Sequence, residues 1–442
     1  MPTQRLASTL FVFTVNDWAS NPDNKYIELL YMTEVIPLLA RQPIFNGNMQ
    51  VVAYELLCRS SELTPTGIRN GDAASSQVLL NAFTELSIEQ VVGKHKAFVN
   101  FTRTLIDTPP PFSKQKLVIE VLEGQKVDAA MLHSLMQLRD QGYTIALDDF
   151  ELTAETESLV AYADIIKLDV LHLSPEKLKQ HINYLKPFGI TLIAEKVETY
   201  EMFEHCKTLG FDLFQGYFLA KPKVITGKKV SENKQSVLQL LSALHDPNVP
   251  IEKVERMIAR DTLLSFKLLR LVNSAAFGLS RSVESLRQAI MLLGLNKLRN
   301  WVNLLALSNL SGKPHELSIA ALTRARMCEL IAEEINQHSR PDSFFTVGLL
   351  STLDAFLDTP LEELLSSLSL SDAINEAMLK HSGPEGMVLQ LVQSHEQGDW
   401  EKINWTDLEK TGLTAERLAE IYVESLRWVA ETMNTLGLGS AD

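Results

Sequence analysis

The sequence predicts a TIM-like (β/α)8 barrel, an α/β fold, followed by an all-α helical bundle domain. At 442 residues the chain is too long for one ordinary core. Its first half alternates short apolar runs with helical patterns, whereas its second half shows helical patterns almost throughout. Polar residues also end many of the apolar runs in the first half, as expected at the active-site face of a parallel barrel.

The composition is that of a globular protein and excludes several classes of partner. Hydrophobic residues make up 45% of the chain and the net charge is -14. Because broad binding of DNA or RNA needs a concentrated basic surface, we expect no nucleic acid polymer as a partner. A small anionic ligand is compatible with this charge if metal ions supply positive charge. No apolar run is long enough to cross a bilayer, so we expect no membrane partner.

Cysteine usage and the N-terminal segment bear on the compartment. Cys58, Cys206 and Cys328 have no CxxC spacing, which suits a reducing cytoplasm. Residues 1–34 fit neither domain and are interpreted as an N-terminal extension with only a faint likeness to a signal peptide. Since Met32 directly precedes the well-patterned sequence, a wrongly assigned start codon is one interpretation. We expect a cytoplasmic protein.

Residues 35–225 are predicted to form the barrel. Helical patterns such as residues 73–90 and 129–142 separate its strand-like runs, and Gly142 is the predicted C-cap of the second. Seven or eight β–α units predict a closed barrel; an open doubly wound sheet is the alternative. The strand-like runs are QVVAYELLCR, KAFVNFT, KLVIEVLE, YTIALDDF, DIIKLDVL, TLIAEKVE and FDLFQGYFLAKP.

Seven hydrophilic side chains occupy equivalent places at or near the ends of seven strand-like runs. In a parallel barrel these ends meet on one face, where active sites form. Any one such residue would more often be a solvated strand end, but seven together predict a site. They are Glu55, Asn100, Glu120, Asp148, Lys167, Glu195 and Gln215.

The adjacent carboxylates Asp148 and Asp149 indicate a metal site. Two acids at a strand end repel each other, and a cation relieves this repulsion. The candidate ligands are all oxygen donors, which favours Mg²⁺ or Mn²⁺ over zinc. Five carboxylates exceed the need of one ion, so two ions are the economical interpretation, as in phosphodiester hydrolysis. Lys167 could orient or deprotonate a water, or simply pair with the carboxylates.

The polar segment 226–235 is the predicted linker, and residues 236–432 are predicted to be all-α. Asp261 is a candidate N-cap of the helix that follows it, and Gly278 is a candidate end of that helix. A second apolar helical pattern precedes Gly294.

The first half resembles the EAL-domain cyclic di-GMP phosphodiesterases. The likeness covers about residues 40–222 and rests on ordered motifs: ARQPIF, YELLCR, FVNFT, IEVLE, LDDF, IKLD, AEKVE and QGYFLAKP. It implies hydrolysis of cyclic di-GMP to linear pGpG in a barrel that holds two Mg²⁺ or Mn²⁺ ions. In a bacterium this would lower the second messenger and favour motility over biofilm.

The resemblance also assigns expected roles to individual residues. It implies a first metal held by Glu55, Asn100, Glu120 and Asp148, and a second held by Asp148, Asp149 and Glu195. It implies that Lys167 positions the attacking water, that Gln215 completes the site, that Gln42 and Arg59 meet the ligand, and that Glu123 and Glu198 support a neighbouring loop.

The sequence departs from the family pattern just after Asp149. The signature triplet reads Glu-Leu-Leu instead of Glu-Ala-Leu, which keeps the ligand. The following loop reads ELTAETESLV, without the glycine usual in the family, and carries Glu151, Glu155 and Glu157. Unless they point away, these acids would disfavour an anionic substrate.

The helical half resembles the HDOD domain, a relative of the metal-dependent HD hydrolases without their metal ligands. RDTLLSFKLLRLVNSAAFGL and SVESLRQAIMLLGLNKLRNW carry this likeness. Ser351 and Thr352 stand where an HD enzyme would have a His-Asp pair. The His245-Asp246 dipeptide is interpreted as a cap-and-turn feature. The resemblance therefore implies a signalling role with an unknown protein partner, and a homodimer is a further expectation.

Three hypotheses follow. The first is an active phosphodiesterase, because every expected acidic ligand, the lysine and the glutamine are present. The second is a catalytically weak or inactive cyclic di-GMP receptor that signals through the HDOD domain, because the loop after Asp149 is altered. The third, ranked last, makes the barrel a scaffold for a helical interaction domain.

Overall fold

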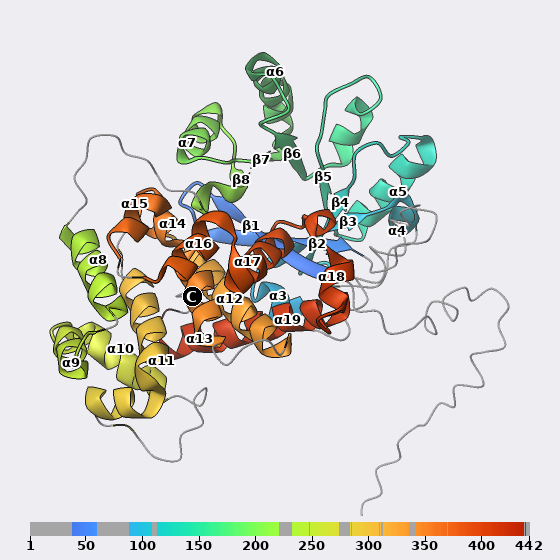
Figure 1. Ribbon diagram of the computed structural model, residues 1–442. Helices are drawn as coiled ribbons and strands as arrows, with labels where there is room; N and C mark the ends of the chain where they lie inside the picture. Colours follow the sequence, from blue (N-terminus) through green and yellow to red (C-terminus); the bar gives the residue numbers. More distant parts are fainter. Residues whose placement is uncertain are drawn as a thin grey trace, which may run out of the picture.

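The computed structural model contains an α/β part and a helical part (Figure 1). It describes residues 38–59, 88–107, 113–220, 232–246, 248–273, 283, 285–308, 310, 313–335, 341–368, 370–436 and 438. The predicted N-terminal extension, residues 1–34, lies outside these ranges, as does Gly278. Within them, no helix combines the length and apolar character needed to cross a membrane.

Eight strands form a closed barrel in the order β1 to β8. The predicted fold class is confirmed, and the open doubly wound sheet is wrong because β8 pairs with β1 and leaves no sheet edge. The strands are β1 (Leu38–Asn46), β2 (Val51–Arg59), β3 (Lys96–Phe101), β4 (Leu117–Val121), β5 (Thr144–Leu147), β6 (Ile165–Asp169), β7 (Thr191–Glu195) and β8 (Leu213–Gln215).

Strand β1 differs from the predicted β–α pattern. It runs antiparallel to both β2 and β8, while the other neighbouring pairs are parallel. The connection from β1 to β2 is a tight turn in which the Asn46 side chain accepts the amides of Asn48 (2.9 Å) and Gln50 (3.0 Å). The register places Gln42 opposite Glu55 and Ile44 opposite Gln215, which brings β1 to the predicted site.

The barrel interior is filled by side chains below the predicted site. Residues two apart along a strand face the same side. On or directly after β2 to β7, each residue of the predicted site therefore lies above an apolar residue two positions earlier in the chain. On antiparallel β1 the apolar residue comes two positions later. These apolar residues form one small cluster: Ile44, Ala53, Phe98, Val118, Ala146, Ile165 and Ile193.

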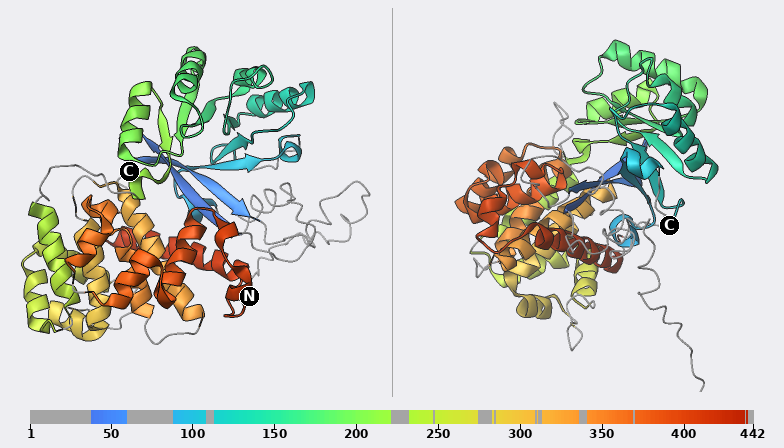
Figure 2. Two further views of the ribbon diagram at one scale, coloured as in Figure 1. Left: turned by 45° about the horizontal axis from the view of Figure 1, so that its top comes forward. Right: turned by 90° about the vertical axis from the view of Figure 1, so that its right-hand side faces the viewer.

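Short helices follow most of the strands and cover the outside of the barrel (Figures 1 and 2). Asp128, Ser174 and Thr199 cap α5, α6 and α7 through their side chains, and Gly142 takes the left-handed conformation just after α5, as the predicted C-cap requires. The elements are α3 (Ile88–Val92), α4 (Arg103–Asp107), α5 (Ala129–Asp140), η3 (Glu157–Tyr162), α6 (Pro175–Leu185), η4 (Lys186–Phe188), α7 (Tyr200–Leu209) and η5 (Tyr217–Ala220).

The second half is helical, as predicted, and its first helix begins at Glu232, inside the segment expected as linker. The α-helices are α8 (Glu232–His245), α9 (Ile251–Ala259), α10 (Thr262–Val272), α11 (Leu286–Ser308), α12 (His315–Glu334), α13 (Pro341–Leu350), α14 (Leu353–Leu357), α15 (Leu361–Ser366), α16 (Asp372–Lys380), α17 (Gly383–Glu396), α18 (Trp405–Glu409) and α19 (Ala415–Thr435), with a 3-10 turn, η7 (Trp400–Lys402), before α18.

Helix α10 begins as predicted but ends earlier. The Asp261 side chain accepts the Leu264 amide at 2.9 Å, which confirms the N-cap. The prediction that the helix continues to Gly278 is wrong, because α10 ends at Val272. The Asn273 side-chain nitrogen then donates to the Val283 carbonyl at 2.8 Å, and its side-chain oxygen accepts the Val283 amide at 2.6 Å. Gly294, with φ 75°, interrupts α11.

The helical half packs on the outer face of β1 and β2 (Figure 2). The Arg41 guanidinium lies 4.2 Å from the Tyr54 ring centroid, and the Tyr54 hydroxyl donates to Glu316 of α12 at 3.0 Å. The Arg41 amide donates to the Tyr422 hydroxyl of α19 at 3.2 Å. Burial raises the pKa of Glu316, and the charge of Arg41 and the Tyr54 hydrogen bond oppose that rise. A buried polar network therefore joins the two halves.

Glu316→Gln is expected to lower the free energy of unfolding by about 3 kcal/mol, because it leaves the Arg41 charge without its acidic partner in the buried interface. Denaturant unfolding of the whole chain measures this. Asp407→Asn is the matched control: it removes an exposed pair with Lys410, for which we expect about 0.5 kcal/mol or less. Equal losses in the two variants would contradict a role for Glu316 at the interface.

Candidate functional site

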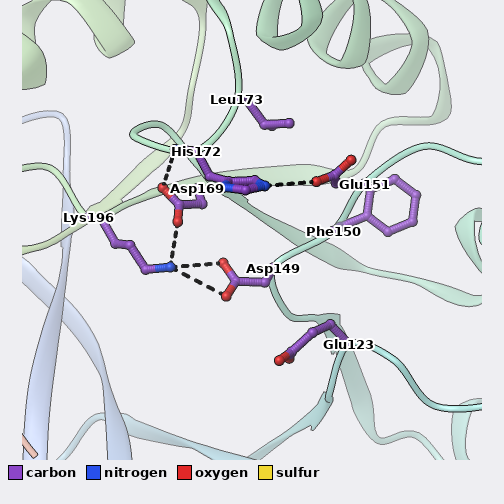
Figure 3. Close-up of a pocket in the computed structure, with 8 residues that line it drawn as sticks. All are labelled: Glu123, Asp149, Phe150, Glu151, Asp169, His172, Leu173 and Lys196. Carbon is purple, nitrogen blue, oxygen red and sulfur yellow. Dashed lines mark hydrogen bonds and ion pairs between the residues drawn. The ribbon is translucent and has the colours of Figure 1, made fainter.

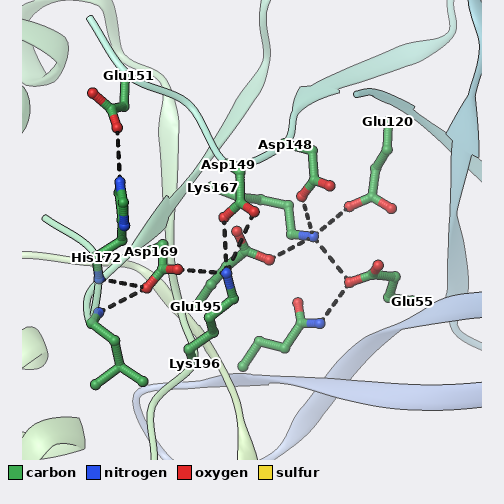
Figure 4. Close-up of polar contacts among 12 residues, drawn as sticks. Glu55, Glu120, Asp148, Asp149, Glu151, Lys167, Asp169, His172, Glu195 and Lys196 are labelled. Carbon is green, nitrogen blue, oxygen red and sulfur yellow. Dashed lines mark hydrogen bonds and ion pairs between the residues drawn. The ribbon is translucent and has the colours of Figure 1, made fainter. Parts of the chain in front are cut away.

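The carboxyl ends of the barrel strands bring the predicted polar residues together (Figure 4). Glu55, Glu120, Lys167, Glu195 and Gln215 are buried in the mouth of the barrel. Asp148 and Asp149 directly follow β5, and Asn100 is half-buried on β3 beside Glu120. The alternation of the strands thus points the seven predicted strand-end residues into the mouth.

Lys167 lies at the centre of this cluster. Its ammonium is 2.9 Å from Glu55 and 2.8 Å from each of three further carboxylates, those of Glu120, Asp148 and Glu195. These four acids come from β2, β4, the end of β5 and β7, so a single cation ties together four parts of the barrel wall. We name this group, with Lys167, the Lys167 cluster.

Burial and mutual charge shift the ionisation of the Lys167 cluster. Burial alone would lower the pKa of Lys167, but the four carboxylates raise it well above its ordinary value. Burial, together with the charges of Glu55 and Asp148, raises the pKa of Glu120 despite Lys167. Burial likewise raises the pKa of Glu195 to about 8. A lysine held in its charged form cannot accept a proton, so this arrangement favours the ion-pair partner over the base.

Gln215 fixes one side of the Lys167 cluster. Its amide nitrogen donates to Glu55 at 2.6 Å and to Gln42 at 2.8 Å. Gln42 therefore belongs to the wall of the site, although it lies on the antiparallel strand β1. The side chain of Arg59, at the end of β2, lies outside the described part of the chain.

Several buried oxygens of the site have no hydrogen-bond donor in the described structure. They are Asn100 Oδ1, Glu120 Oε2, Glu195 Oε2 and Gln215 Oε1. Buried polar atoms are normally satisfied, and carboxylate and amide oxygens are the ligands that hard divalent cations prefer. By the chemistry of its donors, the site therefore fits Mg²⁺ or Mn²⁺.

The carboxylates are nevertheless arranged around an ammonium. Among the described residues, no three acidic, histidine or cysteine side chains already stand in the arrangement of a metal site. Glu55, Glu120, Asp148 and Glu195 each turn an oxygen toward Lys167.

Asp149 does not join the Lys167 cluster. It has a positive φ of 39°, and both its oxygens lie 3.4 Å from the Lys196 ammonium (Figures 3 and 4). Lys196 also donates to Asp169 at 2.5 Å. Burial would raise the pKa of Asp169, but the hydrogen bonds from Lys196 and from the amides of His172 and Leu171 lower it below its ordinary value. The sequence predictions did not include Lys196 or Asp169.

A cavity of about 250 Å³ opens beside Asp149 (Figure 3). Its polar lining includes Glu123, Asp149, Glu151, Asp169, His172 and Lys196. Glu123 is exposed on the turn after β4, and Glu198 is half-buried after β7. Their expected support of a loop remains a prediction.

Two of the three acids of the altered loop, Glu151 and Glu157, contact the β6–α6 region. Glu151 lies 3.3 Å from His172, and Glu157 accepts the Tyr184 hydroxyl of α6 at 2.6 Å. The buried His181 of α6 accepts the Leu152 amide at 2.8 Å, which holds the start of the loop. Glu151 and Glu157 are thus engaged outside the Lys167 cluster. Their histidine and tyrosine partners could not be identified from the sequence pattern.

In the described residues of the helical half, as in those of the barrel, no three acidic, histidine or cysteine side chains stand in the arrangement of a metal site. His245 ends α8 and lies 2.9 Å from the Asn303 amide, and burial lowers its pKa to about 4, with Arg299 adding to the effect. Asp246 accepts the Asn248 amide at 2.9 Å, as the predicted turn requires. The hydroxyls of Ser351 and Thr352 donate to main-chain carbonyls one turn earlier.

Two protein-family models match the chain in the order that the motifs predicted. The EAL domain model matches residues 68–222, and the HDOD domain model matches residues 232–368. Helices α16 to α19 follow the second match.

Two relatives match this chain over about nine-tenths of its length. The uncharacterized protein YuxH of Bacillus subtilis is 35% identical over 407 residues, which cover 90% of this chain and 98% of YuxH. The cyclic di-GMP phosphodiesterase CdgJ of Vibrio cholerae is 33% identical over 407 residues, which cover 91% of this chain and 93% of CdgJ.

Two solved structures match less than half of the chain at low identity. A standalone EAL protein from Vibrio cholerae O395 in a cyclic di-GMP-bound form has 22% identity and a TM-score of 0.35, and the match covers 43% of this chain and 94% of that one. Klebsiella pneumoniae BlrP1 in a manganese and cyclic di-GMP complex has 24% identity and a TM-score of 0.35. The match covers 42% of this chain and 56% of the BlrP1 chain.

Proposed function

The chain belongs to the family of proteins in which an EAL domain is followed by an HDOD domain, and from this premise we propose that it is a metal-dependent cyclic di-GMP phosphodiesterase. The observation that carries the proposal is the buried set of oxygen donors around Lys167, completed by Gln215. The name of CdgJ, which is similar over nearly its whole length, supports the substrate.

Two Mg²⁺ or Mn²⁺ ions are proposed for this site. Glu55, Asn100, Glu120 and Asp148 would hold the first, and Asp148, Asp149 and Glu195 the second. Bound there, such ions lower the pKa of a water molecule and stabilise the attacking and leaving oxygens of a phosphodiester. The buried oxygens without hydrogen-bond donors support these assignments.

The residues of the chain supply orientation and charge. Lys167 keeps its proton and holds four carboxylates together in the mouth of the barrel. Gln215 fixes the orientation of Glu55 from β8. Gln42 and Arg59 would meet the ligand, and the product would be linear pGpG. The cellular effect would be a lower level of cyclic di-GMP, with more motility and less biofilm.

A receptor without turnover is the second candidate. The observation that favours it is the pairing of Asp149 with Lys196 and of four carboxylates with Lys167, since each contact competes with a metal ion. In that case cyclic di-GMP would bind, and the helical half would transmit the bound state to a protein partner.

Turnover is expected to depend on divalent ions. The purified chain should release pGpG from cyclic di-GMP with Mn²⁺ or Mg²⁺, and EDTA should abolish the release because the phosphodiester then lacks the charge that stabilises its transition state. Chromatographic detection of pGpG measures this, with restored Mn²⁺ as the control.

The other outcomes separate the hypotheses. Turnover that persists in EDTA contradicts the metal-dependent mechanism. Tight calorimetric binding of cyclic di-GMP without turnover under either metal supports the receptor. If no binding is detected, both proposals are wrong.

A further inference from the structure

Two lysines divide the acids at the mouth of the barrel between them (Figure 4). Asp148 contacts Lys167 at 2.8 Å, whereas its neighbour Asp149 turns to Lys196. The boundary between the two ion-pair groups therefore runs between adjacent residues. The proposed function assigns Asp148 to both metal ions and Asp149 to the second ion alone.

We propose that Lys196 makes the two metal positions unequal: its ammonium competes for Asp149, so the second divalent ion binds more weakly than the first. This inference rests on the proposed function, because it concerns the metal ions of that site. It makes Lys196 a positioning residue that controls how completely the site is loaded.

The backbone directs Lys196 to this place. It follows Glu195, the last residue of β7, and has φ 57°, a conformation that residues other than glycine rarely adopt. The next residue is fixed, because the Val197 amide donates to the Gln215 carbonyl at 3.0 Å. Gly216 lies against the Val197 backbone, where an added Cβ would be 2.2 Å from the Val197 oxygen. The turn that carries Lys196 is thus held against the end of β8.

Asp169 anchors the Lys196 ammonium beside Asp149. The Asp169 side chain is 13% exposed and also accepts the amides of Leu171 (2.8 Å) and His172 (3.0 Å). Its carboxylate is therefore fixed by its own strand end, and it holds Lys196 at 2.5 Å. Lys196 is consequently retained on the Asp149 side of the mouth by a partner outside the proposed ligand set.

The Lys196 ammonium and a divalent ion compete for Asp149 because both are positively charged. Asp149 is the member of the proposed second ligand set that the Lys167 cluster does not already engage. A divalent ion on Asp149 must either displace the Lys196 ammonium or accept a like charge beside it, and both lower its affinity. Lys167 contacts carboxylates of both proposed ligand sets, so it competes with both ions. Among the described residues Lys196 pairs with Asp149 and Asp169, and of these only Asp149 is a proposed ligand, so Lys196 adds a competitor for the second ion alone.

Binding of Mn²⁺ to the full chain tests the proposal without an activity readout. Calorimetry and Mn²⁺ electron paramagnetic resonance should show one ion bound first and a second bound at least about ten-fold more weakly. Lys196→Gly, which suits the positive φ, and Lys196→Gln should each tighten the second ion about ten-fold or more. The signal of a coupled Mn²⁺ pair should then appear at lower Mn²⁺, and Lys196→Arg should keep the second ion weak.

Lys177→Gln is the matched control. It removes the same charge near Glu151, 3.9 Å away, but does not touch Asp149, so its titration should match that of the unchanged protein. Two ions of equal affinity in the unchanged protein would overturn the proposal, as would Lys196→Gly and Lys196→Gln titrations that superimpose on it. If no ion binds to any variant, the metal-dependent function itself is wrong; if the first ion binds and pGpG is released, that function stands whatever Lys196 does.

Discussion

Lys167→Met is expected to lower the free energy of unfolding by about 3 to 5 kcal/mol, because it removes the cation from a buried group of four carboxylates. Methionine fills much of the same space, so the loss reports charge more than packing. The Lys167 side chain is 1% exposed and lies 2.8 to 2.9 Å from each carboxylate, which excludes water as a replacement partner at most of these contacts. Denaturant unfolding of the whole chain measures the effect.

Two comparisons make the Lys167→Met result specific. Lys177→Met removes an exposed lysine and should change the free energy of unfolding by about 0.5 kcal/mol or less. Mn²⁺ should stabilise Lys167→Met more than it stabilises the unchanged protein, because the Lys167 ammonium no longer competes for the carboxylates. A bound ion adds about 2.7 kcal/mol at a hundred-fold excess over its Kd. A Lys167→Met variant as stable as the Lys177→Met control would mean that the ammonium does not hold the carboxylates.

Glu55→Gln is expected to lower kcat/KM for cyclic di-GMP by at least about a thousand-fold, or about 4 kcal/mol of transition-state stabilisation. One Glu55 oxygen already accepts from Lys167 at 2.9 Å and from Gln215 at 2.6 Å. The amide places an N–H donor where the site needs an acceptor, and it removes one negative charge from the proposed first metal position. Release of pGpG with saturating Mn²⁺ is the measurement.

Glu155→Gln serves as the control for this loss. Glu155 is exposed on the loop after Asp149, so its replacement should leave kcat/KM within about two-fold. The Glu55→Gln variant should also keep its Lys196–Asp149 and Lys196–Asp169 contacts, since neither involves Glu55. If Glu55→Gln retains a tenth or more of the activity, Glu55 is not a metal ligand.

The convergence of the site could be predicted from the sequence because it follows from strand geometry. Residues at equivalent places in parallel strands meet on one face, and period-two alternation turns them inward above the apolar interior. Strand β1 could not be placed in the same way. Its sequence LLARQPIFN carries Arg41 and Gln42 side by side. The tight turn sets its antiparallel pairing with β2, but its pairing with β8 joins residues far apart in the chain.

The contacts of Lys196 could not be predicted because they join three separate strand ends. Spacing places Lys196 beyond β7, but its approach to Asp149 and Asp169 depends on a positive φ and on the neighbouring strand β6. The direction of the acidic loop likewise depends on His181 and Tyr184, which belong to α6. In both cases the deciding partners come from elsewhere in the chain.

Strand β1 is shared between the two halves of the molecule. Arg41 faces outward to Tyr54 and Tyr422, and its neighbour Gln42 faces inward to Gln215, which holds Glu55. The barrel wall is one strand thick at this point, and consecutive Cα atoms are about 3.8 Å apart. A movement of α19 that shifts the Arg41 amide therefore acts on the residue directly before Gln42, so strand β1 links the helical half to the site.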